Sequence, residues 1–139
     1  MKMESNKKHE YRSRLEDAEA YAEVWKIVKT TIKSSLNEKR VGIMLFLDDL
    51  PLRIGTYHPL GTNNIVLNRV FMNIVEASSK PKPLINAFVY VLLLHEYLHA
   101  LGRHSETQVR TLIYKISSES FGPDHITAQL TERGDLGTS

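Results

Sequence analysis

Two histidines separated by three residues are the strongest chemical feature of this sequence. His95 and His99 enclose Glu96, Tyr97 and Leu98, so the stretch matches the pattern H-E-x-x-H. Residues four apart lie on one face of an α-helix, so both imidazoles can reach a single metal ion. Zinc prefers nitrogen ligands at about 2 Å in a tetrahedral arrangement. The spacing therefore predicts a zinc site with His95 and His99 as ligands.

Glu96 is the candidate general base of this site. It adjoins the first ligand, where its carboxylate can take a proton from a metal-bound water molecule and pass it to a leaving amine. The preceding residues, 85–94, are almost all apolar, which predicts a helix buried in the core. Histidines and a glutamate at the end of a buried helix cost free energy unless they are paired or bind a metal. This context favours metal binding over two surface histidines.

Three downstream residues are candidates for a third ligand, and the sequence leaves the choice open. Glu106 ranks first, because it precedes Val109 and Ile113 on the inward face of the next expected helix. His125 stands at the start of the last expected helix and can fold back as a ligand or as a donor to the tetrahedral intermediate. His104 can be a ligand only if the turn at Gly102, after the helix that carries His95 and His99, directs it back towards the metal. A histidine in such a loop is more often exposed to solvent.

The elements that must position these residues are helices on either side of a small sheet. A single long helix is expected over 11–36, and the ends, 1–9 and 134–139, are expected to be disordered. Short apolar or alternating runs predict three strands, and later periodic stretches predict the remaining helices. The expected strands are 41–47, 52–57 and 65–67, and the later helices are 69–77, 84–101, 105–118 and 124–131. The fold class is α+β, in one domain over 1–139.

Composition narrows the function further. Of 139 residues, 42% are hydrophobic and 24% charged, which is typical of a soluble globular domain. The net charge of +2 gives no reason to expect nucleic-acid binding, and the absence of cysteine excludes disulfides, cysteine-ligated zinc and a cysteine nucleophile. The start of the chain has no secretory pattern, and the longest apolar run is too short for a bilayer. We expect a cytoplasmic protein without membrane or nucleic-acid partners.

The stretch His-Glu-Tyr-Leu-His-Ala-Leu-Gly, residues 95–102, resembles the zincin metallopeptidases. The resemblance implies a zinc-dependent hydrolase with Glu96 as general base, two histidine ligands and a third protein ligand downstream. In zincins a strand often lies at the edge of the cleft, and residues 65–67 stand at the corresponding place in this sequence. The resemblance also implies that such an edge strand pairs with an extended substrate peptide. Metzincins carry a histidine at the position of Ser105, so this chain departs from their pattern there. Gluzincins take a glutamate from a following helix, usually further downstream than Glu106.

The sequence therefore predicts a zinc-dependent metallopeptidase with Zn²⁺ as cofactor and a peptide or protein as substrate. Because the chain is short for a zincin, a latent enzyme that needs activation is one form of this hypothesis. Two alternatives stay open, a metal-dependent amide hydrolase that is not a peptidase and a zinc-binding regulatory or structural domain without turnover. A Tyr57 or His58 side chain, in a turn-rich region, is a candidate hydrogen-bond donor to an oxyanion, although such loop residues more often lie at the surface.

Overall fold

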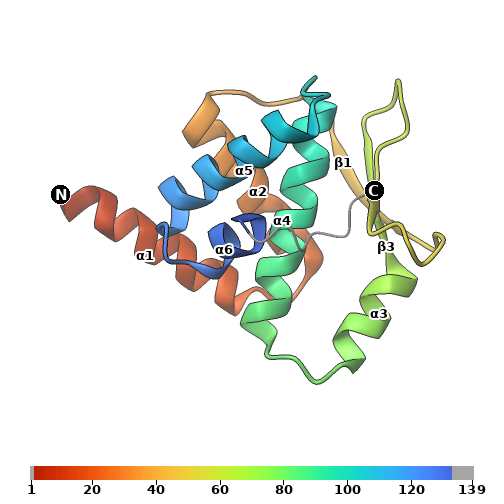
Figure 1. Cartoon of the computed structure of the whole chain (residues 1–139), viewed down its shortest axis with the longest axis horizontal. Helices are drawn as coiled ribbons and strands as arrows, with labels where there is room; N and C mark the ends of the chain where they lie inside the picture. Colours follow the sequence, from red (N-terminus) through yellow and green to blue (C-terminus); the bar gives the residue numbers. More distant parts are fainter. Residues whose placement is uncertain (1, 133–139) are drawn as a thin grey trace.

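The structure of the chain, a computed structural model, describes residues 2–132 (Figure 1). Six helices and one three-stranded sheet lie within that range, which confirms the predicted α+β class. In chain order the elements are α1 (Lys2–Asp17), α2 (Tyr21–Leu36), β1 (Met44–Asp48), β2 (Thr56–Tyr57), β3 (Asn64–Asn68), α3 (Arg69–Ala77), α4 (Lys82–Ala100), α5 (Glu106–Phe121) and α6 (Ile126–Glu132). The predicted tail, 134–139, lies outside the described residues.

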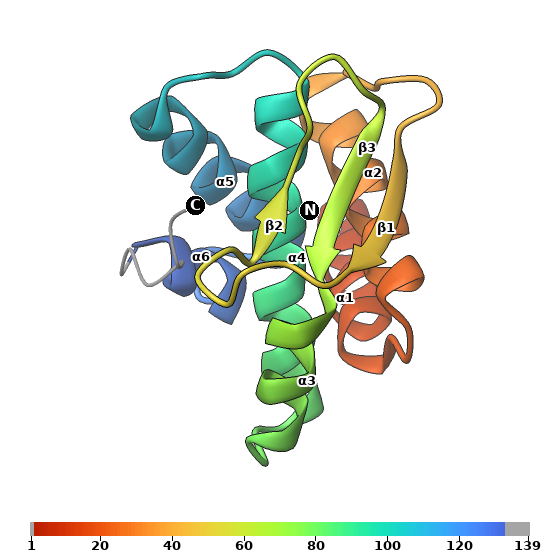
Figure 2. The ribbon, with the colours of Figure 1, turned by 90° about the vertical axis from the view of Figure 1, so that its right-hand side faces the viewer.

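Helix α4 forms the centre of the molecule. It is apolar around its whole circumference, which is the pattern of a helix surrounded by protein, and its residues from Ile85 to Leu98 are almost all buried. Helices α1, α2, α5 and α6 pack against one side of α4, and the sheet covers another side (Figures 1 and 2). This arrangement places the H-E-x-x-H stretch near the end of a helix that its neighbours hold on several sides.

The long N-terminal helix predicted over 11–36 is wrong, because the chain forms two helices separated at 18–20. Asn86 of α4 explains the break. Its side-chain amide donates hydrogen bonds of 2.9 Å to the carbonyl oxygens of Leu15 and Ala18, at the point where α1 ends. The expectation of disorder over 1–9 also differs from the structure, in which α1 begins at Lys2.

The sheet has the order β1-β3-β2. Strand β1 runs parallel to β3, and β2 folds back antiparallel to the other side of β3 (Figure 2). The segment 65–67 therefore lies in the central strand, and its predicted place at the edge of a cleft is wrong. The strand predicted over 52–57 is reduced to Thr56–Tyr57, which forms the edge nearer the H-E-x-x-H helix.

Buried Asn68 organises the loop that leads into β2. Its side chain caps α3 by accepting a hydrogen bond of 3.0 Å from the amide of Val70, as expected for asparagine before a helix. It also accepts from the amide of Leu50 and donates to the carbonyl oxygens of Leu50, Pro51 and Ile54. One side chain thus fixes both the start of α3 and the loop before Thr56.

Replacing Asn68 with Ala is expected to lower the free energy of unfolding by about 3 kcal/mol, because it leaves several backbone groups without the partners that a buried side chain supplies. Urea denaturation measures the change. Asn73→Ala is the matched control, since Asn73 is exposed on α3. If the two variants differ by less than about 1 kcal/mol, the hydrogen bonds of Asn68 do not stabilise the fold as argued.

The C-terminal half follows the sequence pattern closely. Gly102 ends α4, and the Ser105 hydroxyl caps α5 by accepting a hydrogen bond from the amide of Gln108. Both features are local, so their residue types alone predict them. None of the helices in the described part of the chain combines the length and the apolarity needed to cross a membrane.

Candidate metal centre

A tight turn after α4 brings the start of α5 back over the two histidines. The amide of Arg103 donates to the carbonyl oxygen of Leu98 at 3.1 Å, and the amide of Gly102 donates to that of His99 at 3.0 Å. These bonds form a Schellman motif, which requires a left-handed residue and therefore favours glycine, and Gly102 has φ +103°. Ser105 then starts α5, so Glu106 is the first residue of the returning helix.

Three candidate ligands meet at this turn. The Nε2 atom of His95 lies 2.9 Å from one carboxylate oxygen of Glu106, and the Nε2 atom of His99 lies 2.7 Å from the other. One ligand atom from each residue can be chosen so that all three lie within 4.8 Å of one another. The structure therefore brings together both histidines of the motif and the first-ranked third ligand.

The donor set suits zinc. Ligand atoms about 2 Å from a tetrahedral zinc ion lie about 3.3 Å apart, and the three ligand atoms here already lie within 4.8 Å of one another. The Nδ1 atom of His99 lies 2.6 Å from the carbonyl oxygen of Arg103, to which it donates. This bond orients the ring and leaves Nε2 as the nitrogen that faces Glu106.

Glu106 has an electrostatic reason to be ionised. Burial raises its pKa, but hydrogen bonds and charge from His95 and then His99 outweigh that effect and hold the pKa below its ordinary value. An ionised carboxylate is the form that binds a metal. The two imidazoles and Glu106 are therefore a complementary set in both geometry and charge.

Glu96 lies beside the ligand set without joining it. Its side chain is buried, at 7% exposure for the residue, and one carboxylate oxygen lies 3.8 Å from Nδ1 of His95. The buried hydroxyl of Thr56, on edge strand β2, lies 3.5 Å from the same oxygen and points a donor at it. Glu96 is thus held between the Nδ1 side of His95 and the sheet.

Two arginines that the sequence analysis missed hold the surroundings of the site. The Arg40 guanidinium donates to the carbonyl oxygens of Ala100 and Thr62, each at 2.8 Å, and so joins the end of α4 to the β2–β3 loop. The Arg103 guanidinium forms a two-pronged ion pair with Glu38, and this pair lowers the pKa of Glu38. The Arg103 carbonyl orients the ring of His99. By fixing Arg103, the ion pair with Glu38 therefore helps to hold this candidate ligand in place.

The other candidates lie elsewhere. His104 is exposed in the turn and does not belong to the three-residue group. His125 stacks on Phe121, with ring centroids 4.9 Å apart, and its Nδ1 contacts the Thr127 hydroxyl at 2.8 Å. Burial first, and then the charge of Arg12, lower the pKa of His125. These contacts assign His125 to packing between α5 and α6.

Tyr57 and His58 are the two candidate oxyanion donors, and their side chains are not directed at Glu96 as that of Thr56 is. The Nδ1 atom of His58 lies 2.9 Å from the carbonyl oxygen of Asn64 and so ties the β2–β3 loop together. Tyr57 follows Thr56 in a strand, and successive side chains of a strand point to opposite faces. Because Thr56 faces Glu96, Tyr57 faces away from it. The oxyanion role of Tyr57 and His58 stays a prediction that this geometry does not favour.

Comparison with known proteins adds no family. No protein-family model, no curated protein and no solved structure matches the chain. The functional argument therefore rests on the residues and their geometry.

Proposed function

We propose that this chain is a zinc-dependent peptidase in which His95, His99 and Glu106 hold the metal and Glu96 acts as general base. The observation that carries the proposal is the convergence of three ligand atoms beside a buried, separate carboxylate. A catalytic zinc site typically has three protein ligands and keeps one position for water or substrate. The chemistry of two histidines and one carboxylate is that of hydrolytic zinc sites.

Zinc held by these ligands would polarise a scissile carbonyl and lower the pKa of water. Glu96 would accept the proton of that water and return it to the leaving amine. The Thr56 hydroxyl would hold the carboxylate of Glu96 in place, since it reaches the oxygen that lies nearer His95. The Arg103 carbonyl would keep Nε2 of His99 directed at the metal.

A peptide substrate is supported by the position of β2. This strand pairs with β3 on one side only, so its other edge has backbone groups that can bind an extended chain. Thr56 belongs to this strand and contacts Glu96, so a peptide added along β2 would run beside the general base. This arrangement favours an extended peptide over a compact small amide.

The main rival is a zinc site that stabilises the domain without turnover. Such sites are usually closed by four protein ligands. Among residues 2–132, the group at the turn offers three, and neither His104 nor His125 belongs to it. The open set is the reason for preferring the catalytic interpretation.

The decisive experiment measures metal content and peptide hydrolysis together. Purified, untagged wild-type protein is expected to hold about one zinc per chain, and His99→Ala about none, because two remaining ligands bind zinc weakly. His104→Ala is the matched control, since it removes an exposed histidine outside the ligand group. A mixture of quenched fluorescent peptides is then incubated with each protein, with and without a chelator.

Each outcome has a distinct meaning. Zinc in the wild type, its loss in His99→Ala and chelator-sensitive cleavage support the peptidase. Zinc that stabilises the protein, without cleavage of any peptide in the mixture, supports the structural rival. A wild-type protein that binds no zinc after incubation with it overturns the metal site itself.

A further inference from the structure

Strand β1 leaves an apolar edge of the sheet uncovered within the described residues. Met44, Phe46 and Leu47 are 56%, 43% and 42% exposed, and residues 41–47 contain neither a charge nor a proline. The amide of Met44 donates to the carbonyl oxygen of Asn63, on the β3 side of the strand. Because backbone groups alternate along a strand, those of Leu45 and Leu47 point away from β3, to the free edge. An edge of this kind readily pairs with another strand.

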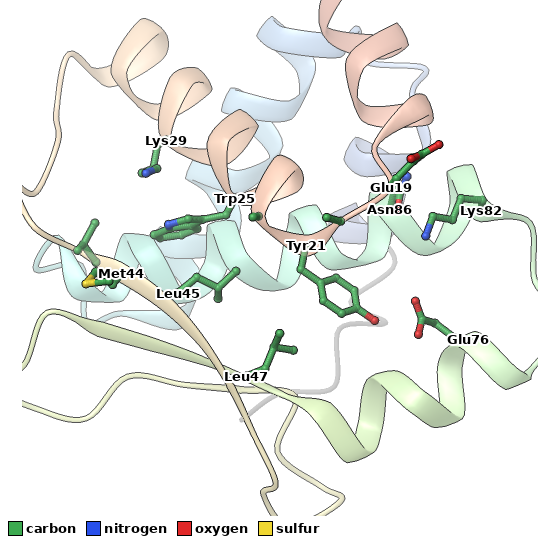
Figure 3. A pocket seen from close by; sticks show the side chains of 13 residues that line it. Glu19, Tyr21, Trp25, Lys29, Met44, Leu45, Leu47, Glu76, Lys82 and Asn86 are labelled. Carbon is green, nitrogen blue, oxygen red and sulfur yellow. The ribbon is translucent and has the colours of Figure 1, made fainter.

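A groove of about 520 Å³ runs along the inner side of this edge, between β1 and α2 (Figure 3). Trp25, Leu45 and Leu47 give it an apolar floor. At one end the buried hydroxyl of Tyr21 points toward Glu76. Burial, and then Glu76, raise the pKa of this hydroxyl. The groove thus adds apolar surface to the exposed side chains of β1, and a polar-rimmed apolar surface of this kind is typical of an interaction site.

The two ends of the groove carry opposite charge. Lys29 lies at one end, beside Trp25 and Met44, whereas Glu19 and Glu76 lie at the other end together with Lys82 (Figure 3). Two identical grooves placed side by side by a two-fold axis perpendicular to the sheet are antiparallel, so the Lys29 end of each meets the Glu19 end of the other. A parallel arrangement would bring like charges together. The charge pattern therefore selects a second copy of this chain, in antiparallel orientation, as the occupant.

We propose that β1 is the interface of a homodimer, in which two β1 strands pair antiparallel and join the two sheets into one of six strands. With the axis at Phe46, Leu45 of one copy lies opposite Leu47 of the other, and their outward backbone groups form the new hydrogen bonds. The side chains that now line the exposed groove become the apolar core of the interface. The active-site edge, β2, lies at the opposite side of the sheet and stays free.

Sedimentation equilibrium of the zinc-treated full chain tests the proposal. Protein concentrations from about 1 to 100 µM span the dissociation constants expected for an interface of modest size. Wild-type protein is expected to reach twice the chain mass of 15.9 kDa. Leu47→Lys places a charge in the interface and is expected to weaken dimerisation about 100-fold or more. Leu60→Lys is the control, because Leu60 is 91% exposed in the loop between β2 and β3, away from the β1 edge.

A charge exchange tests the orientation of the pair. Lys29→Glu and Glu19→Lys are each expected to weaken dimerisation about tenfold, because like charges then meet across the axis, and the double variant is expected to recover it. Circular dichroism checks that each variant is folded. A wild-type protein that stays monomeric throughout this range overturns the proposal, even if it binds an unrelated peptide. So does a dimer that Leu47→Lys and both single charge variants leave unchanged, since it uses another surface.

Discussion

Glu96→Gln is expected to lower kcat for peptide hydrolysis by about 10³-fold while zinc content stays at the wild-type level. The amide preserves the size of the side chain but cannot accept the proton of the attacking water, and general acid–base catalysis is commonly worth about 10² to 10⁴. Glu96 is not among the three ligands that meet at the turn, so its loss leaves that set intact. Steady-state kinetics and metal analysis on the same preparation measure both quantities.

The stability of the same variant separates this role from a structural one. Glu96 is buried and its described polar neighbours are Thr56 and His95, so a neutral amide is expected to fold at least as stably as the carboxylate. Glu10→Gln, on the exposed face of α1, controls for the loss of one negative charge. An active Glu96→Gln enzyme would show that another group takes the proton. A variant that loses zinc with its activity would show that Glu96 holds the metal.

Much of the candidate metal centre could be predicted because its signals are local. Two histidines four apart, a glycine after the helix and a serine before the next one each have a physical meaning that a few neighbours decide. The placement of Glu106 follows from these three features together. The turn at Gly102 reverses the chain, the cap at Ser105 starts α5 at once, and the first residue of that helix must lie above the last turn of α4.

The supporting contacts could not be predicted, because they join residues distant in sequence. Thr56 reaches Glu96 across 40 positions, and Glu38 reaches Arg103 across 65. A threonine in a short strand and a glutamate after a helix are equally common at plain surfaces. Their roles arise only when β2 and the end of α2 are packed against α4, and a single sequence carries no record of that packing.

The break between α1 and α2 was missed for a related reason. The apolar stripe passes through Ala18 without a glycine or proline to interrupt it, so periodicity favours one helix. The deciding residue is Asn86, which lies in the apolar run of α4 and satisfies the carbonyl oxygens at the end of α1. An amide in such a run needs buried partners. Asn86 was therefore the signal in the sequence that backbone carbonyl groups from another segment, here the end of α1, pack against α4.

Glu106→Gln tests the ligand that the sequence left uncertain. It is expected to weaken zinc binding by more than 100-fold, that is, beyond the roughly 10- to 100-fold effect of changing a residue that only supports a ligand. Both carboxylate oxygens of Glu106 face imidazole nitrogens, and the amide replaces one oxygen with a donor that repels the metal. Competition with a chromophoric zinc chelator measures the affinity. Glu119→Gln is the matched control, because it changes a glutamate near the other end of α5.

Thermal stability gives an independent measure of the same interaction. Zinc at about 1,000 times its Kd stabilises the folded state by about 4 kcal/mol, so a chelator should lower the melting temperature of the wild type. The chelator should lower the melting temperature of Glu106→Gln much less, because a site weakened more than 100-fold keeps at most about 1.4 kcal/mol of that stabilisation at the same zinc concentration. If Glu106→Gln keeps its zinc while His125→Ala or His104→Ala releases it, the third ligand is that histidine. The 2.7 Å and 2.9 Å contacts of Glu106 would then describe only the metal-free arrangement.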